Sequence, residues 1–328
     1  MTILITGGAG YIGSHVVRLF KEKGHNVVVF DNLEGGSSEI PKKLGAEIVQ
    51  GDLREPSIVN ALNNYPRSGT GKFDACLHFA AYASVSDSVK NPEIYFENNV
   101  AGSTNLISYL IKKGCPNFIF SSTSEVYGEA KYLPIDENHP LDPVNPYGLS
   151  KRMVEQVLEW ASTAGKIKFV GLRYFNAAGC SLDGLIGEDH EPENHLIPNA
   201  ILGALGKKEF KLTCSKVDTP DGTPVRDYIH VLDLADAHLK ALEYLVNGGE
   251  SDFFNLGTGS GYSVLQVIET VEKITGVTLK KVYGETRSGE PAQKYASKDK
   301  ATKVLKWNPK YNLEDMVTTT HKYLKSKN

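Results

Sequence analysis

Tyr147 and Lys151 stand four positions apart at the start of a segment with a helical pattern. This spacing places both side chains on one face of a helix. A tyrosine with a pKa of ~10 is a poor base at neutral pH, but a lysine ammonium ~5 Å away, at an effective dielectric constant of ~20, lowers that pKa to about 8. The pair therefore predicts a general base that takes the proton of a hydroxyl group. The same letters also fit an amphipathic helix with an exposed lysine.

A run of hydroxyl side chains, Ser121-Ser122-Thr123, follows an apolar segment typical of a buried strand. In a doubly wound sheet, ligands lie beyond the carboxyl ends of the strands. A hydroxyl at this place can bond a substrate hydroxyl and relay its proton, so we expect Thr123 or Ser122 at the site. A serine-rich turn without a ligand is the alternative.

Glycines recur in the segment Gly7-Gly8-Ala9-Gly10-Tyr11-Ile12-Gly13, directly after the first strand-like run and at the start of the first helical pattern. Glycine permits a tight turn, the approach of the backbone to a pyrophosphate, and close packing of the helix on the strand. The N–H groups of the helix N-terminus then face the anion. The segment therefore predicts a dinucleotide-binding turn.

Two aspartates follow the next strand-like runs. Asp31 comes 18 residues after Gly13, where it can accept both ribose hydroxyls of adenosine and would repel a 2′-phosphate, which favours NAD over NADP. A surface turn at Asp31-Asn32 is the alternative. Asp52 is expected at the adenine edge, unless it is a carboxylate at a helix N-terminus.

Apolar runs alternate with helical patterns through the first 175 residues. The strand-like runs are Ile3–Ile5, Val27–Phe30, Glu47–Val49, Ala75–Phe79, Phe118–Phe120 and Phe169–Leu172. The helical patterns include Ile12–Lys23, Asn99–Lys112 and Tyr147–Ala164. Continuous apolar strands separated by helices predict an α/β fold with a doubly wound parallel sheet, covered on both faces.

The second half has more loop-forming composition. We expect an NAD-binding Rossmann domain at residues 1–175 and a smaller α/β lobe, mainly substrate-binding, at 176–328, with segments around 225–257 returning to the first domain. Asp183–Pro198 is predicted as a loop and Asp218–Thr223 as a turn cluster. Helical patterns return at Leu232–Val246 and Val264–Thr275, and Lys322–Asn328 is predicted as a solvated tail.

Composition excludes several classes of protein. The 328 residues are 41% hydrophobic and 23% charged, which is typical of a globular chain and not of a disordered one. No run reaches the ~18 apolar residues of a membrane span, and a net charge of −3 argues against a nucleic-acid partner.

The cysteines and the N-terminus indicate a compartment. Cys76, Cys115, Cys180 and Cys214 lack the spacing of a zinc site or a disulfide framework. The first residues lack the pattern of a signal peptide. A cytoplasmic protein with free thiols and no metal is therefore expected.

With these residues in this order, the chain resembles the extended short-chain dehydrogenase/reductase family. Further motifs narrow the resemblance to the UDP-glucose 4-epimerases of that family. They are His78–Ala81, Asn98–Val100, Arg173–Gly179, Ile186–Asp189, His195–Pro198 and Val225–Val231. The likeness covers nearly the whole chain.

The resemblance implies an isomerase that holds NAD tightly. Tyr147 would take the proton from O4 of a UDP-hexose while hydride leaves C4, and return of hydride to the other face of a 4-keto sugar would invert C4. This interconverts UDP-galactose and UDP-glucose, with the N-acetylhexosamine forms as a further expectation. Thr123 would bond O4, and Lys151 would hold the nicotinamide ribose and lower the pKa of Tyr147. A homodimer formed through helices of the N-terminal domain is also implied.

The resemblance also implies two sets of binding residues. The cofactor set is Gly7, Gly10, Tyr11, Ile12, Gly13, Asp31, Asn32, Asp52, Leu53, Phe79, Ala80, Ala81, Asn98, Ser121, Tyr147, Lys151 and Tyr174. The substrate set is Thr123, Tyr147, Asn176, His195, Leu196, Arg226, Arg287 and Glu290. Arg226 and Arg287 would clamp the diphosphate, because a guanidinium matches phosphate oxygens. Glu290 would bond the uridine ribose.

The chain departs from the family pattern at four places. Ala83 replaces a lysine that reaches the cofactor pyrophosphate in many members. Thr213-Cys214-Ser215 replaces an Ile-Phe-Gly stretch near the uracil. Lys294 falls near a position whose size helps to decide whether an N-acetyl group fits. Glu125 stands where decarboxylases and dehydratases of nucleotide sugars carry an acidic residue that takes part in the chemistry.

Two alternatives follow from these departures. The nearer one is another NAD-dependent UDP-sugar enzyme, a UDP-glucuronate decarboxylase or a 4,6-dehydratase. Against it, Ser124 occupies the place where a dehydratase has an aspartate before the glutamate. The other alternative is a non-catalytic dinucleotide sensor, which would lack Tyr147 and Lys151.

Overall fold

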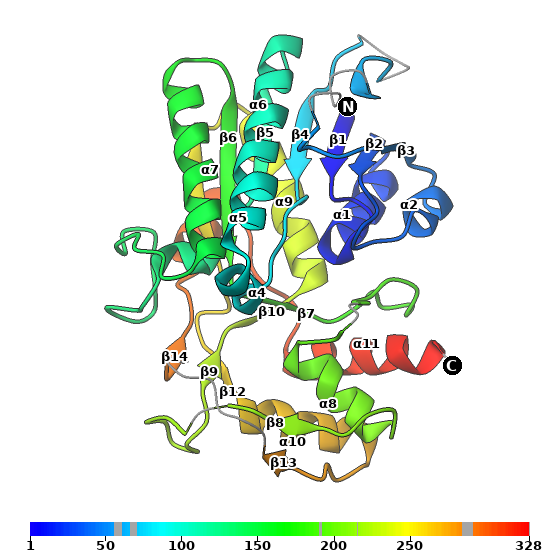
Figure 1. Ribbon diagram of the computed structural model, residues 1–328, viewed down its shortest axis with the longest axis vertical. Helices are drawn as coiled ribbons and strands as arrows, with labels where there is room; N and C mark the ends of the chain where they lie inside the picture. The colour runs from blue at the N-terminus through cyan, green and yellow to red at the C-terminus, as the bar shows by residue number, and fades with distance from the viewer. Residues whose placement is uncertain (56–60, 66–70, 190–191, 215, 284–290, 328) are drawn as a thin grey trace.

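The computed structural model describes residues 1–55, 61–65, 71–189, 192–214, 216–283 and 291–327. Its main body is a parallel sheet of seven strands in the order β11-β6-β5-β4-β1-β2-β3 (Figure 1). The strands are β1 (Thr2–Thr6), β2 (Asn26–Asp31), β3 (Glu47–Gln50), β4 (Ala75–His78), β5 (Asn117–Ser121), β6 (Lys168–Tyr174) and β11 (Asp252–Leu256). The predicted doubly wound parallel sheet is confirmed.

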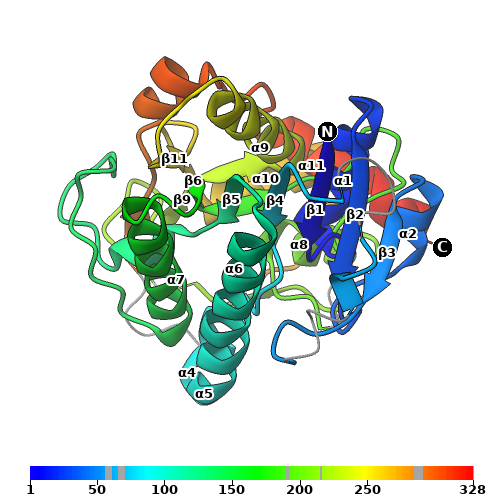
Figure 2. The ribbon, with the colours of Figure 1, turned by 90° about the horizontal axis from the view of Figure 1, so that it is seen from above.

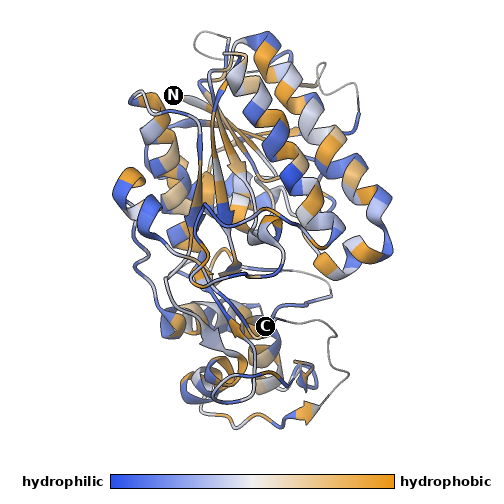
Figure 3. Ribbon diagram, turned by 90° about the vertical axis from the view of Figure 1, so that its left-hand side faces the viewer, coloured by the Kyte–Doolittle hydropathy of each residue, from blue (hydrophilic) through white to orange (hydrophobic). Residues whose placement is uncertain are grey.

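Helices cover both faces of the sheet (Figure 2). One face packs against α1 (Tyr11–Glu22) and α9 (Val231–Val246), and the other against α6 (Gly102–Lys113) and α7 (Pro146–Thr163). Apolar residues such as Leu4, Ile5 and Leu77 are fully buried between these layers, so the strands read as continuous apolar runs (Figure 3). The sheet therefore holds its carboxyl edge, where ligands bind in such folds, as a rigid platform.

Short elements complete the upper body. They are α2 (Glu39–Lys43), α4 (Val85–Lys90), α5 (Pro92–Tyr95), the π-helices η1 (Phe96–Ala101) and η3 (Ala301–Leu305), and the 3₁₀ helix η2 (Ser124–Tyr127). β11 comes from the second half of the chain and pairs in parallel with β6, from Asp252 opposite Val170 to Leu256 opposite Tyr174. The domain boundary after residue 175 stays a prediction.

A smaller lobe lies below the carboxyl edge of the sheet (Figure 1). Its helices are α8 (Leu196–Ala204), α10 (Val264–Thr275) and α11 (Leu313–Ser326), which share an apolar core. Its strands are β7 (Asn176–Ala178), β8 (Lys211–Leu212), β9 (Val225–Arg226), β10 (Tyr228–His230), β12 (Tyr262–Ser263), β13 (Val282–Tyr283) and β14 (Gln293–Lys294). β7 pairs with β10, while β9 lies between β12 and β14.

Two local predictions in this lobe are wrong. The loop predicted up to Pro198 ends earlier, because α8 begins at Leu196. The solvated tail predicted from Lys322 is instead the last turn of α11, where Tyr323 and Leu324 are buried. The lysines that suggested a tail lie on the exposed side of this amphipathic helix.

All four cysteines are free thiols; three are buried and Cys214 is half-buried. This agrees with the absence of disulfide spacing. Among the helices of the described residues, none combines the length and apolar character that crossing a bilayer requires.

Candidate active site

The glycine segment forms a tight turn between β1 and α1. Gly7 adopts a positive φ of 71°, and Gly10 occupies the N-cap of α1 with no side chain capping the helix. A Cβ added to Gly13 would lie 2.1 Å from the carbonyl oxygen of Gly7. Helix and turn therefore approach each other as closely as only glycine permits, which leaves the helix N-terminus accessible for an anion.

A groove runs from this turn across the carboxyl edge of the sheet. The predicted cofactor residues that line it are Gly7, Gly10, Asp31, Asn32, Asp52, Leu53, Phe79, Ala80, Ala81 and Asn98. The sequence reading missed six further lining residues, which are Phe30, Glu34, Gly35, Gly36, Gly51 and Tyr82. These segments come from the ends of four neighbouring strands, so the groove fits an elongated dinucleotide.

Asp31 and Asp52 are held in place within the groove. The Asp31 carboxylate accepts hydrogen bonds from the backbone N–H groups of Ala9, at 3.0 Å, and Leu33, at 2.8 Å. It is therefore oriented by the glycine turn itself. Hydrogen bonds from the Arg54 guanidinium lower the pKa of Asp52 to about 2, so this carboxylate stays charged. Asp52 thus has a structural partner in addition to any ligand.

Tyr147, Lys151 and Thr123 come together at the end of β5. Tyr147 lies in the first turn of α7, next to the N-cap Asn145, whose side chain accepts a hydrogen bond from the N–H of Gly148 at 2.8 Å. The Lys151 ammonium donates to the carbonyl oxygen of Ser121 at 2.9 Å. Lys151 is only 3% exposed, so the alternative of an exposed helix lysine is wrong.

Thr123 approaches Tyr147 from the other side. It is buried at the N-cap of η2, and its side chain is hydrogen-bonded to Tyr147. The hydroxyl groups of Ser121 and Tyr174 bond to each other beside this pair. The hydroxyl groups of Thr123, Tyr147, Ser121 and Tyr174, each of which can hold or move a proton, therefore meet at the carboxyl edge.

The expected lowering of the Tyr147 pKa by Lys151 is not present in the protein alone. Burial raises the pKa of Tyr147 well above its usual value, and the hydrogen bond with Thr123 acts in the opposite direction without offsetting it. Burial also lowers the pKa of Lys151 to about 7, against the attraction of Glu155. The physical reason is desolvation, because a half-neutral buried lysine cannot offset the cost of a buried phenolate.

Other predicted cofactor residues lie beside the groove and not in its lining. The Tyr11 hydroxyl donates to the carbonyl oxygen of Gly179, at 2.5 Å, and so ties α1 to the second lobe. Ile12 packs partly buried against the main core. Ser121 and Tyr174 lie at the carboxyl ends of β5 and β6, and Tyr147 and Lys151 lie in the first turns of α7.

The predicted substrate residues come mainly from the second lobe. Asn176 begins β7, and its side-chain amide donates to the carbonyl oxygen of Asp227 at 3.0 Å, next to Arg226. Arg226 is half-buried in β9 and lies opposite Lys294 of β14. Leu196 begins α8 and is half-buried. Arg287 and Glu290 lie outside the described residues.

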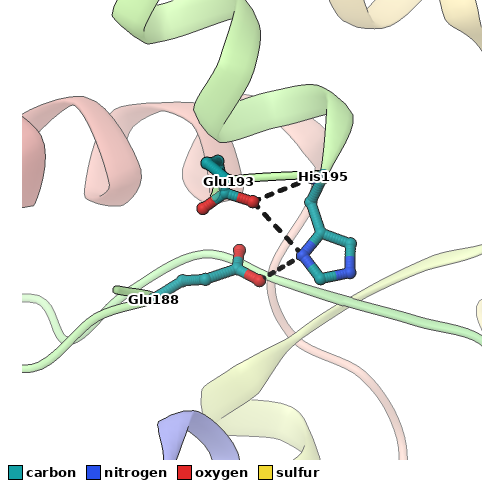
Figure 4. Close-up of side chains that lie close together, drawn as sticks. All are labelled: Glu188, Glu193 and His195. Atoms are coloured by element: carbon teal, nitrogen blue, oxygen red, sulfur yellow. Dashed lines mark hydrogen bonds and ion pairs between the residues drawn. The ribbon is translucent and has the colours of Figure 1, made fainter. Parts of the chain in front are cut away.

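His195 forms a cluster with two glutamates before α8 (Figure 4). Its Nδ1 atom is ion-paired with Glu188 and lies 3.4 Å from Glu193. The His195 side chain is 56% exposed, and hydrogen bonds with the two carboxylates raise the pKa of His195 to about 10. The three side chains lie close enough together to hold a metal ion, and binding of a metal would have to displace the proton of the imidazole.

A buried polar network that the sequence reading missed supports the site. Glu155, one turn beyond Lys151, binds Arg173 of β6 through two hydrogen bonds of 2.8 Å and accepts the hydroxyl of Ser122 at 2.6 Å. The stripe of Tyr147, Lys151 and Glu155 at spacings of four was a signal available in the sequence.

Asn99 lies in the motif Asn98–Val100, but no role in the site was predicted for it from the sequence. It binds both backbone groups of Tyr82 and the hydroxyl of Ser150 from within the π-helix η1. Such helices often mark functional sites. Asn99 therefore joins the cofactor groove to α7.

The departures from the family pattern have defined surroundings. Glu125 forms an ion pair with Lys294 at 2.6 Å and accepts a hydrogen bond from Asn145 at 2.8 Å. Ala83 is exposed, and Thr213 and Cys214 are half-buried beside β8. Ser215 lies outside the described residues.

Comparison with known proteins identifies the family. Residues 3–257 match the NAD dependent epimerase/dehydratase family. A UDP-glucose 4-epimerase of Lactobacillus helveticus is 44% identical over 99% of this chain and 98% of its own length. A crystal structure of UDP-glucose 4-epimerase, 40% identical, matches with a TM-score of 0.94 over 100% of this chain and 98% of that one.

A third relative was crystallised with both ligands of interest. It is the UDP-glucose 4-epimerase of Bifidobacterium longum in complex with NAD⁺ and UDP, 34% identical, with a TM-score of 0.90 over 99% of this chain and 98% of that one. The chain therefore belongs to the NAD-dependent epimerase/dehydratase family, within which it groups with the UDP-glucose 4-epimerases.

Proposed function

We propose that this protein catalyses the reversible, NAD-dependent 4-epimerisation of UDP-galactose and UDP-glucose through a 4-keto sugar. The observation that carries the proposal is the meeting of Tyr147, Thr123 and Lys151 at the end of β5, on the same carboxyl edge of the sheet as the groove beside the glycine turn. The relatives that cover the whole chain carry this activity in their names.

The residues present fit NAD. The glycine turn leaves room that a Cβ would fill, α1 offers its N-terminus to an anion, and Asp31 lies where it can accept ribose hydroxyls. Bound NAD supplies a reversible hydride acceptor for C4 of the hexose. The carboxylate of Asp31 favours NAD over NADP, because a 2′-phosphate would meet a negative charge.

The chain's own residues handle the proton. Tyr147 takes it from O4 as the C4–H bond breaks, and returns it after the keto sugar has presented its other face. Thr123 holds O4 by a hydrogen bond and also bonds Tyr147. Lys151, fixed by the carbonyl of Ser121, holds the nicotinamide ribose and favours the ionised form of Tyr147 when it is charged.

The second lobe holds the UDP part of the substrate. We assign Asn176 and Arg226, with Arg287, to the diphosphate, His195 and Leu196 to the uracil, and Glu290 to the uridine ribose. In support, the side chain of Asn176 donates to the carbonyl oxygen of Asp227, the residue that follows Arg226, and β7 and β9 both lie below the carboxyl edge of the main sheet (Figure 1). A guanidinium suits a diphosphate because it offers paired donors.

The surroundings of Glu125 argue against a decarboxylase or dehydratase. Both carboxylate oxygens are engaged as acceptors, one by Lys294 and one by Asn145. A substrate group that used this carboxylate would have to displace one of these two donors.

The test is incubation of the purified protein with UDP-galactose and no added cofactor, followed by separation of the nucleotide sugars. UDP-glucose without net NADH is the expected product. Tyr147→Phe should lower kcat by ~10²-fold or more, whereas Tyr95→Phe, a neighbouring tyrosine 6.4 Å away between ring centres, should leave it nearly unchanged.

Other products would lead to different conclusions. Activity that depends on added NAD would indicate weak retention, with Ala83 as the first residue to examine. Loss of CO₂ from UDP-glucuronate, without epimerisation, would refute the proposal.

We also propose that two copies associate through α4, α5 and α7. These helices pack together and carry exposed apolar side chains, which are Val85, Val89, Ile94, Leu149, Met153 and Trp160. Such a surface is typical of an interface between copies. Sedimentation should show a dimer that Met153→Glu dissociates, whereas Val246→Glu on α9, which is 50% exposed against 37% for Met153, should not. The free thiols support a cytoplasmic location.

A further inference from the structure

An ion pair crosses between the two parts of the molecule next to the reacting tyrosine. The Lys294 ammonium of β14 lies 2.6 Å from the Glu125 carboxylate of η2, 169 residues away in sequence. The side chain of Lys294 is 8% exposed and that of Glu125 is 23% exposed. Two charges that leave water to this extent interact more strongly than a pair on the surface.

The Glu125 carboxylate is also fixed against the start of α7. Its second oxygen accepts a hydrogen bond from the side-chain amide of Asn145, whose own oxygen caps Gly148. A Cβ on Gly148 would lie 2.5 Å from the carbonyl oxygen of Glu125. The chain Lys294–Glu125–Asn145 therefore ends at the helical turn that carries Tyr147.

Several ionisable groups face Tyr147 from the elements around it. They are Lys151 on α7, Glu125 on η2, Tyr174 on β6, Tyr95 on α5 and Asp87 on α4, the last acting through the hydroxyl of Tyr95, with Glu97 exposed on η1. Among the groups that raise the pKa of Tyr147, Glu125 is the carboxylate. Lys294 is its cationic partner.

We propose that the Lys294–Glu125 pair, in addition to joining the two lobes, sets how readily the Tyr147 hydroxyl gives up its proton. Lys294 cancels the field of a carboxylate that would otherwise oppose a negative charge on Tyr147. Both residues act through Tyr147 and are positioning residues. The inference rests on the proposed function, in which Tyr147 is the base.

The pair makes a prediction with two opposite signs. Lys294→Met leaves the Glu125 charge uncompensated, so the acid limb of the kcat–pH profile should move to higher pH. Glu125→Gln leaves the Lys294 charge uncompensated, so the limb should move to lower pH. A unit charge several ångströms from a partly solvated site shifts such a limb by about half to one pH unit. The double variant should return close to the wild-type profile.

The experiment measures UDP-galactose epimerisation at saturating substrate and NAD from pH 5.5 to 9 for the wild type, both single variants and the double variant. The matched control is Lys300→Met, which removes another ion pair of 2.6 Å, with Asp252 at the amino end of β11. Lys294→Arg keeps the charge and should keep the wild-type limb. Circular dichroism and the melting temperature of each variant show whether a change in the profile comes from a folding defect.

The outcomes divide clearly. Opposite shifts that cancel in the double variant support the inference, because a purely structural pair would change both singles in the same direction. Shifts of the same sign, no shift, or an equal shift in Lys300→Met overturn it. An inactive wild type overturns the proposed function and this inference together, whereas an active wild type with unshifted profiles overturns this inference alone.

Discussion

Two arginines bind the same glutamate, and we predict that their removal has very different costs. Arg173 is 2% exposed and holds Glu155 through two hydrogen bonds of 2.8 Å. Arg152 reaches the same carboxylate at 3.2 Å, but its side chain is 18% exposed and it also pairs with Glu159. Glu155 itself is fully buried. Arg173→Met therefore leaves a buried carboxylate whose remaining hydrogen-bond partners, within the described part of the chain, are Ser122 and Arg152.

The cost follows from this geometry. Breaking a buried ion pair by removing one partner lowers the free energy of unfolding by about 3–5 kcal/mol, because the other charge stays buried. Loss of a partly exposed partner costs about 0–1 kcal/mol. Relative to the wild type, Arg173→Met should therefore lower the melting temperature by roughly 5–10 °C, and Arg152→Met by at most roughly 2 °C. Urea unfolding and thermal melting of both variants, at saturating NAD, measure this difference.

A double variant tests the cause. Arg173→Met combined with Glu155→Leu should regain most of the loss, because apolar groups can replace a buried pair. Equal losses in the two arginine variants would refute the reasoning.

Three further predictions concern the cofactor site. Gly13→Ala should destabilise the fold and abolish NAD binding, because its Cβ would lie 2.1 Å from the Gly7 carbonyl oxygen. Gly10→Ala should still fold, because its Cβ would lie 3.4 Å from the same oxygen. Thermal melting and NAD titration distinguish the two variants. Asp31→Ala should weaken NAD binding about 10- to 100-fold by calorimetry, since hydrogen bonds to a charged group are worth ~1.5–3 kcal/mol; unchanged affinity would contradict its role. Burial lowers the pKa of Lys151 to about 7. Between pH 7 and about 10 the unfolded state therefore binds more protons than the folded state. In urea unfolding of the NAD-free protein, the free energy of unfolding should rise with pH over this range relative to that of Lys151→Met. A constant difference between the two would show that the pKa is not lowered.

The sheet could be predicted because its causes are local. Strands buried on both faces need continuous apolar runs, and each predicted run lies within an observed strand or overlaps it by all but one residue, as with Ala75–Phe79 and β4. The glycine turn and the spacing of Tyr147 and Lys151 are local for the same reason. α7 begins one residue before its prediction, at Pro146, which suits the first position of a helix.

The contacts between distant segments could not be predicted in this way. The Lys294–Glu125 pair and the Glu155–Arg173 pair depend on the packing of distant elements. The sequence contains many other lysines, arginines and glutamates, and nothing in it indicates which of them form ion pairs. The end of α11 was misjudged because composition near a terminus suggested solvent, while Tyr323 and Leu324 pack into the second lobe. Tertiary packing decided each of these cases.

The largest quantitative error concerned Tyr147, and its cause explains how the site works. The Coulomb argument placed a charged lysine beside a tyrosine that was otherwise as well solvated as in water. In the protein, burial raises the pKa of the tyrosine and lowers that of Lys151 to about 7, so the lysine alone cannot prepare the base. A bound oxidised nicotinamide would add a positive charge, which favours an ionised tyrosine in the same way as a charged lysine does. The base would then be best prepared when the hydride acceptor is bound, and loss of the proton would be tied to loss of the hydride.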